Sequence, residues 1–162
     1  MANGPDIDAL RQQDQAFRAK QRTRVRAEVE RRGLASFMNQ TRWMELKAAI
    51  QRLTFAPPYQ RQDVLDSPEP LWESDRIPSQ GCWCHECLEP FHSIEWLRII
   101  PQYWRETGAL LPLTLAGDCS EALRDELKGL NIPFREDRRG FWVYGYAASD
   151  PTLDPDPGPT AD

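Results

Sequence analysis

The chain has 162 residues, of which 40% are hydrophobic, and a formal net charge of −5 from 25 acidic and 20 basic residues. This length suits one compact domain and excludes two domains of full size. The longest mainly apolar stretch, Leu110–Ala116, is short and contains Pro112, and no basic segment followed by an apolar run opens the chain. The sequence therefore predicts no membrane span and no secretion signal, and we expect a cytoplasmic protein.

Charge is unevenly distributed along the chain. Residues 1–33 carry eight Lys and Arg against five Asp and Glu, and residues 147–162 carry four Asp and no base. All six Trp and all four Tyr lie between these two ends. We therefore predict three parts, which are a basic helical arm (1–33), a globular domain (34–146) and a disordered, acidic, proline-rich tail (147–162).

The basic arm has neither Pro nor Gly between Asp6 and Gly33, which predicts one long polar helix. Its apolar positions are sparse: Leu10, Phe17, Val25 and Val29. Such a helix is either a solvated element or an arm that binds nucleic acid or another partner through Arg18–Arg32. Acidic residues dilute its charge and no aromatic residue interleaves with it, so nucleic acid is the less favoured partner.

The globular part alternates helical and strand patterns. A helix is predicted at Thr41–Leu53, where Trp43, Leu46 and Ile50 share one face, and another begins near Asp118 and buries Leu123, Leu127 and Leu130. Strands are predicted at Arg61–Leu65, Leu71–Ile77, His92–Ile100, Ile132–Phe134 and Gly140–Tyr146, with a charged turn at Arg135–Arg139. This order predicts an α+β fold, in which two helices pack on an antiparallel or mixed sheet of about four to six strands.

One short segment concentrates chemically reactive side chains. Cys82, Cys84 and Cys87 form a C-x-C-x-x-C pattern, with His92 five residues further on. Thiolates and imidazole at this spacing suit a tetrahedral Zn²⁺ site made of these four residues, with His85 or Cys119 as alternative fourth ligands. Two other interpretations stay open: small buried side chains on a strand, and a transient redox pair.

Signatures of the common enzyme classes are missing. The chain has no G-x-S-x-G, G-x-x-x-x-G-K-[ST], G-x-G-x-x-G or H-E-x-x-H pattern, and its two His residues both lie beside the cysteines. We therefore expect a binding protein and no enzyme. Acidic residues next to an aromatic anchor suit a basic partner. We therefore expect a partner-binding surface with Trp72 as the anchor and with the acidic residues Glu73, Asp75, Glu86 and Glu89.

Four ordered motifs carry a resemblance to a known family. They are Thr41-Arg-Trp43-Met-Glu-Leu46, Ser93-Ile-Glu-Trp-Leu97, Ile132-Pro133 and Gly140-Phe-Trp-Val-Tyr-Gly-Tyr146. Over about residues 39–146 the chain resembles small bacterial proteins of unknown function. Acidic single-domain proteins of this type are similar to the immunity partners of bacterial toxins. The resemblance does not require Cys82, Cys84 or Cys87.

Two functional hypotheses follow. The first is a non-enzymatic immunity protein that binds a cognate toxin with a basic surface and needs no cofactor. The second is a small zinc-binding regulatory protein that uses Cys82, Cys84, Cys87 and His92. Neither hypothesis involves a membrane.

Overall fold

The computed structural model describes residues 6–71, 77, 79–106, 108 and 112–152. Its helices are α1 (Ile7–Arg32), α2 (Gln40–Ile50), α3 (His85–Leu88) and α4 (Ser120–Gly129), with a 3₁₀ turn, η2, at Phe91–Ser93. Its strands are β1 (Ala35–Ser36), β2 (Tyr59–Asp63), β3 (Ile94–Ile99), β4 (Gln102–Arg105), β5 (Thr114–Asp118), β6 (Phe134–Asp137), β7 (Gly140–Tyr144) and β8 (Tyr146–Ala147). This is the α+β fold that the sequence predicts.

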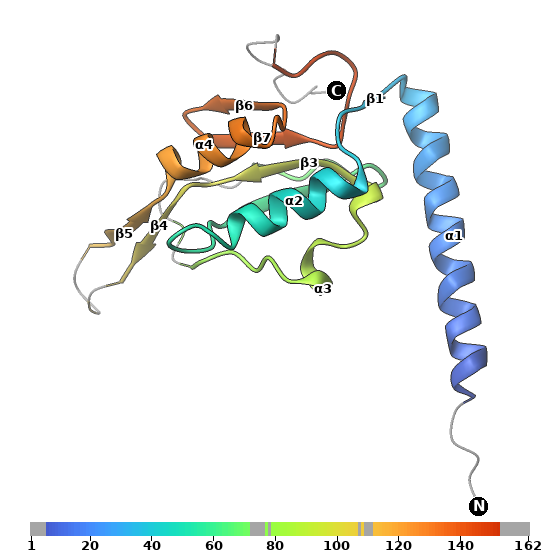
Figure 1. The fold of residues 1–162 in the computed structure, drawn as a ribbon. Helices are drawn as coiled ribbons and strands as arrows, with labels where there is room; N and C mark the ends of the chain where they lie inside the picture. Colours follow the sequence, from blue (N-terminus) through green and yellow to red (C-terminus); the bar gives the residue numbers. More distant parts are fainter. Residues whose placement is uncertain (1–5, 72–76, 78, 107, 109–111, 153–162) are drawn as a thin grey trace, which may run out of the picture.

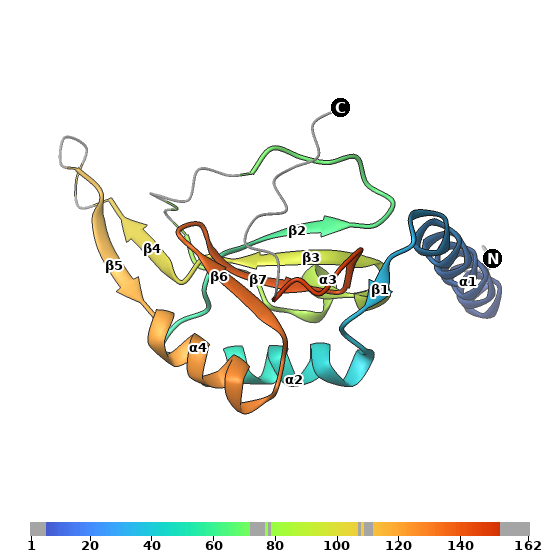
Figure 2. The ribbon, with the colours of Figure 1, turned by 90° about the horizontal axis from the view of Figure 1, so that it is seen from above.

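The centre of the fold is a four-stranded antiparallel sheet in the order β2-β3-β7-β6. Figure 2 shows α2 and α4 together on one side of this sheet. Leu97, Ile99 and Val143 of the sheet join Leu46 and Leu123 of the two helices in one hydrophobic core. The helices therefore form because each has an apolar face that the sheet removes from water.

The opposite face of the sheet is polar and aromatic. Arg98 is fully buried there, and its guanidinium lies 5.8 Å from the ring of Trp142, which is also buried. Gln60 and Gln62 extend this layer, and each donates a hydrogen bond to a backbone carbonyl of the segment that follows β2. The buried Trp43, Trp83 and Trp142 show that these aromatic residues build the interior of the domain.

Two smaller antiparallel pairs flank the sheet at opposite ends (Figure 1). β1 pairs with β8 beside α1, and β4 pairs with β5 in a projecting hairpin. This hairpin is not predicted from the sequence, where the predicted strand His92–Ile100 ends just before Pro101. In the structure the chain turns at Pro101 and continues as β4.

The long N-terminal helix is confirmed, with the ends that its sequence predicts. Asp6 Oδ1 accepts hydrogen bonds from the backbone N–H groups of Asp8 and Ala9, and Gly33 ends the helix at a left-handed φ of 65°. The C-terminal end of α1 is held to the domain by Arg32, whose guanidinium makes a bidentate ion pair with Glu95 at 2.6 and 2.8 Å. No helix among the described residues is both long and apolar enough to cross a membrane.

Two strand predictions need correction, and a third lies mostly outside the described residues. The strand predicted at 61–65 begins two residues earlier, at Tyr59, and the one predicted at 132–134 lies at Phe134–Asp137. The charged segment after Phe134 extends as a strand because Arg135 stacks on Trp142, 5.2 Å from the ring centroid, and pairs with Asp137 at 3.2 Å. Of the strand predicted at 71–77, residues 72–76 lie outside the described part of the chain.

Candidate metal centre

The cysteine-rich segment is a loop between β2 and β3 that contains α3 (Figure 1). Side chains alternate in direction along it, because Trp83 and Leu88 are buried in the core while Cys82 and Cys87 are exposed and Cys84 is half-buried. The two apolar residues therefore fix the loop to the domain and leave the thiols at its surface. The interpretation of Cys82 and Cys84 as buried side chains on a strand is wrong, because Cys82 is exposed, Cys84 is half-buried and neither lies in a strand.

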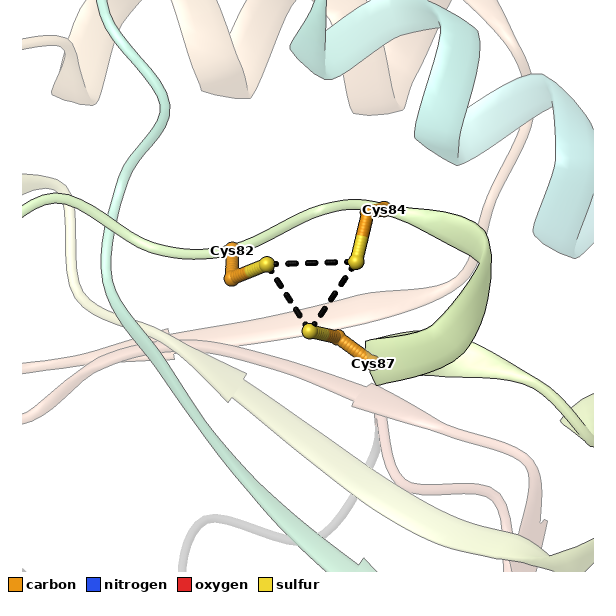
Figure 3. A group of neighbouring side chains, drawn as sticks. All are labelled: Cys82, Cys84 and Cys87. Atoms are coloured by element: carbon orange, nitrogen blue, oxygen red, sulfur yellow. Dashed lines mark hydrogen bonds between the residues drawn. The ribbon is translucent and has the colours of Figure 1, made fainter.

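Three thiols meet at one point in this loop. The Sγ–Sγ distances are 3.2 Å between Cys82 and Cys84, 3.1 Å between Cys84 and Cys87, and 2.8 Å between Cys87 and Cys82. Figure 3 shows the three side chains pointing toward one another from both sides of the turn into α3. All three cysteines are free. We call this group the tri-cysteine cluster.

Backbone contacts from β2 and the core hold the loop in place. The indole N–H of Trp83 donates to the Pro57 carbonyl at 2.8 Å, and the Tyr59 hydroxyl donates to the Cys82 carbonyl at 2.7 Å. Arg61 donates to the carbonyls of Cys87 and Leu88 at 3.3 and 2.7 Å. The backbone of two of the three cysteines is therefore held by Tyr59 and Arg61 of β2, a role that no sequence motif indicates.

An ion pair with Asp63 orients the side chain of Arg61. Asp63, two residues along β2, accepts two hydrogen bonds from the guanidinium at 2.6 and 2.9 Å. Residues two apart on a strand share one face, so the ion pair keeps Arg61 over the loop. The position of the tri-cysteine cluster thus depends on the ion pair between Arg61 and Asp63 of β2.

The thiols and their neighbours perturb one another electrostatically. Hydrogen bonds from Cys87 and Cys84 lower the pKa of Cys82, while the same bond to Cys82 raises the pKa of Cys87 to about 12. Burial, followed by the nearby thiolate charge, raises the pKa of Tyr59 to about 12. The pKa of Glu86 is lowered by its own backbone N–H and then by the Cys84 thiol. Of the three thiols, Cys82 is thus the one whose ionisation the cluster favours, and Tyr59 stays a hydrogen-bond donor.

The cluster suits a thiophilic metal ion. Zn–S bonds of about 2.3 Å in tetrahedral geometry place sulfur atoms roughly 3.8 Å apart, so each pair here needs to separate by about 1 Å or less. Surface side chains can make this shift without disturbing the core. Among the described residues, no fourth His, Cys, Asp or Glu joins the group.

His92 is not brought to the cluster, which corrects the predicted four-residue ligand set. Between Cys87 and His92 the chain buries Leu88 and Phe91, and this places His92 on the side of α1. There, burial and then the charge of Arg22 lower the pKa of His92. His85 follows Cys84 directly, but its Nε2 lies 2.7 Å from Glu89 Oε2. The structure thus assembles three of the four predicted ligands.

Cys119, the other alternative ligand, is distant from the cluster. It is buried at the start of α4, its thiol donates to the Pro101 carbonyl at 3.4 Å, and burial raises its pKa to about 12. A buried thiol of this kind is chemically inert. A substitution of Cys119 therefore provides a control for the same substitution in the tri-cysteine cluster.

The residues predicted to bind a partner are only partly described. Trp72, Glu73 and Asp75 lie outside the described residues. Glu86 and Glu89 border the cluster on α3 and at its end, where Glu86 is exposed and Glu89 is half-buried against His85. Two of the five predicted partner-binding residues thus lie next to the thiols in the sequence and on the same loop.

A pocket of about 320 Å³ lies elsewhere, between the β6–β7 turn and the start of α4. Asp137, Arg138, Arg139 and Ser120 contribute to its lining, together with Trp104. None of the predicted site residues that the structure describes (Cys82, Cys84, Glu86, Cys87, Glu89 and His92) lines it.

Sequence comparison places the chain among known proteins only at the level of a family. The profile of a family of unknown function (DUF6678) matches residues 25–150. The chain belongs to this family. No curated protein and no solved structure matches the chain. Membership in the DUF6678 family therefore covers the whole sheet and the tri-cysteine cluster, and it begins at Val25, the one buried residue of α1.

Proposed function

We propose that this protein is a small zinc-binding regulatory protein, without catalytic activity of its own, in which Cys82, Cys84 and Cys87 hold one Zn²⁺ ion. The observation that supports the proposal is the approach of three free thiols within 3.2 Å of one another on an anchored surface loop. Thiolate ligands favour zinc and other thiophilic ions over Mg²⁺ or Ca²⁺. With three protein ligands, the fourth tetrahedral position is available to water or to a group from outside the described chain.

The competing chemistry of the same thiols is a disulfide between two of them. The cluster favours metal over a simple redox pair because three sulfurs converge, whereas a disulfide uses two and leaves the third without a role. All three can ligate one ion together. The metal and the disulfide exclude each other, so they give opposite results with a chelator and with a reductant.

Metal removal tests this proposal. If zinc binds the folded chain and is present at about 100 times its dissociation constant, it stabilises the fold by about 2.7 kcal/mol, which is roughly 5–10 °C in melting temperature for a chain of this size. We expect a chelator to lower the melting temperature by that amount, and added zinc to restore it. A melting temperature that responds to reductant but not to chelator would contradict the proposal and favour the redox pair.

A second candidate function, the binding and neutralisation of a cognate toxin, is supported by a surface next to the cluster. Met44 on α2 is 56% exposed, although it is large and apolar. One helical turn further on, Lys47 is close enough to lower the pKa of Glu86 on α3. An exposed apolar side chain with exposed carboxylates nearby suits a partner with a basic rim.

Protection of cells tests the toxin-binding candidate. When the chain is co-expressed with a toxin encoded beside it, we expect Met44→Glu to reduce protection because it places a charge at the apolar contact. Ala122→Glu, an exposed position on α4, provides the matched control and should protect like the unmodified chain. Equal protection by Met44→Glu, or none by the unmodified chain, would exclude this surface.

A further inference from the structure

The N-terminal half of α1 extends beyond the domain, with no packing partner among the described residues (Figure 1). The helix has 26 residues, yet Val25 is its only buried residue. Three large apolar side chains on the free part are strongly exposed: Ile7 at 62%, Leu10 at 52% and Phe17 at 60%. A helix that leaves such residues in water gains little from packing, so this exposure indicates an interaction surface.

These side chains share one face with the residue that docks the helix. At 100° per residue, Ile7, Leu10, Asp14, Phe17, Gln21 and Val25 fall within an arc of about 80°. Val25 is 3% exposed at the end of α1 that contacts η2. The domain therefore covers only the C-terminal end of a continuous stripe, which we call the α1 stripe.

Charge along α1 is segregated by position. Residues 6–17 contain three Asp and one Arg, whereas residues 18–26 contain five bases and no acid. Two such helices side by side in the same direction place like charges together. In opposite directions, the acidic half of each lies against the basic half of the other.

We propose that two copies of this chain associate through antiparallel pairing of their α1 stripes. In this arrangement Leu10 of one copy packs against Phe17 of the other, twice by symmetry. Asp14 lies near the centre, where Arg18 of its own helix already pairs with it at 2.8 Å. The domain contacts α1 near the C-terminal end of the helix, so antiparallel pairing places the two domains at opposite ends of the helix pair.

Sedimentation equilibrium of the full chain tests the pairing with two variants of equal charge. Phe17→Glu places a carboxylate in the stripe, and loss of a buried Phe should weaken dimerisation at least about tenfold. Ala19→Glu adds the same charge at an exposed position on the other side of the same helix, and we expect it to change the dissociation constant by less than about twofold. Both positions lie outside the core, so both variants keep the fold.

Salt dependence identifies the direction of pairing. Antiparallel helices attract through their charges, so raising ionic strength should weaken the dimer, whereas it would strengthen a parallel pair by screening repulsion. An unmodified chain that stays monomeric at about 100 µM would overturn the proposal. Equal effects of Phe17→Glu and Ala19→Glu would also overturn it, as would a monomer that binds duplex DNA through the basic half of α1.

Discussion

Replacing Cys87 with serine should lower the affinity for zinc at least about 100-fold, because the loss even of residues that only orient metal ligands costs 10- to 100-fold. Serine keeps the size of the side chain but removes the thiolate that lies 2.8 and 3.1 Å from the other two sulfurs. The measurement is competition for zinc against a chromophoric chelator. Cys87 is exposed, so the variant should retain the circular dichroism spectrum of the unmodified chain.

Cys119→Ser provides the matched control for this substitution. It makes the same chemical change at a buried thiol on α4, away from the tri-cysteine cluster. We expect unchanged zinc affinity with a modest loss of stability. If both variants bind zinc equally, whether well or poorly, the three-thiolate site is contradicted.

Replacing Gly145 with alanine should produce a large loss of stability from a single added methyl group. A Cβ atom there would lie 2.0 Å from the Ile94 carbonyl oxygen, and 3.4 Å from the Trp43 ring. The backbone of Gly145 also donates to Glu95 and accepts from Phe37, so it cannot move without breaking these bonds. We expect a loss of about 3 kcal/mol, or roughly 6–12 °C in melting temperature.

Gly129→Ala tests whether the loss at Gly145 comes from the close approach. Gly129 is the last residue of α4, and a Cβ atom added there meets nothing within 4 Å. Alanine should therefore stabilise the protein slightly, by about 0.4–1 kcal/mol, because it restricts the unfolded chain. Thermal melts of the two variants should shift in opposite directions, and a similar loss at both positions would refute the explanation.

Two glycines of the closing strand motif show which features of the fold a local sequence pattern predicts. Gly140 and Gly145 belong to the motif Gly140–Tyr146, and its apolar pattern predicts the position of β7 correctly. Both glycines lie against the backbone of β3, since a Cβ atom at Gly140 would lie 2.4 Å from the Ile99 carbonyl oxygen. That reason depends on strand order and register, which a local pattern does not contain.

Helices were predictable where caps and periodicity agree, as at Asp6 and Gly33 of α1. The polar face of the sheet was not predictable, because a charged residue normally indicates a surface or a turn. Arg98 and Arg135 belong to the interior through Trp142, which lies between their strands in the sheet. The charged segment after Phe134 was therefore assigned to a turn.

The candidate site was likewise predictable only where the sequence pattern is local. The spacing of Cys82, Cys84 and Cys87 is local and predicts their convergence, which the structure confirms. The position of His92 depends on the burial of Leu88 and Phe91 in a core assembled from distant segments. Spacing alone therefore could not exclude it as a ligand.

Native mass spectrometry of the chain purified with zinc counts the ions that the folded protein binds. We expect a mass that corresponds to one zinc ion per chain, and no bound zinc when Cys82, Cys84 and Cys87 are all replaced by serine. A chain that carries no zinc at all, or is lighter by the two hydrogens lost on forming a disulfide, would contradict the three-thiolate site. Zinc retained by the triple-serine variant would contradict it equally.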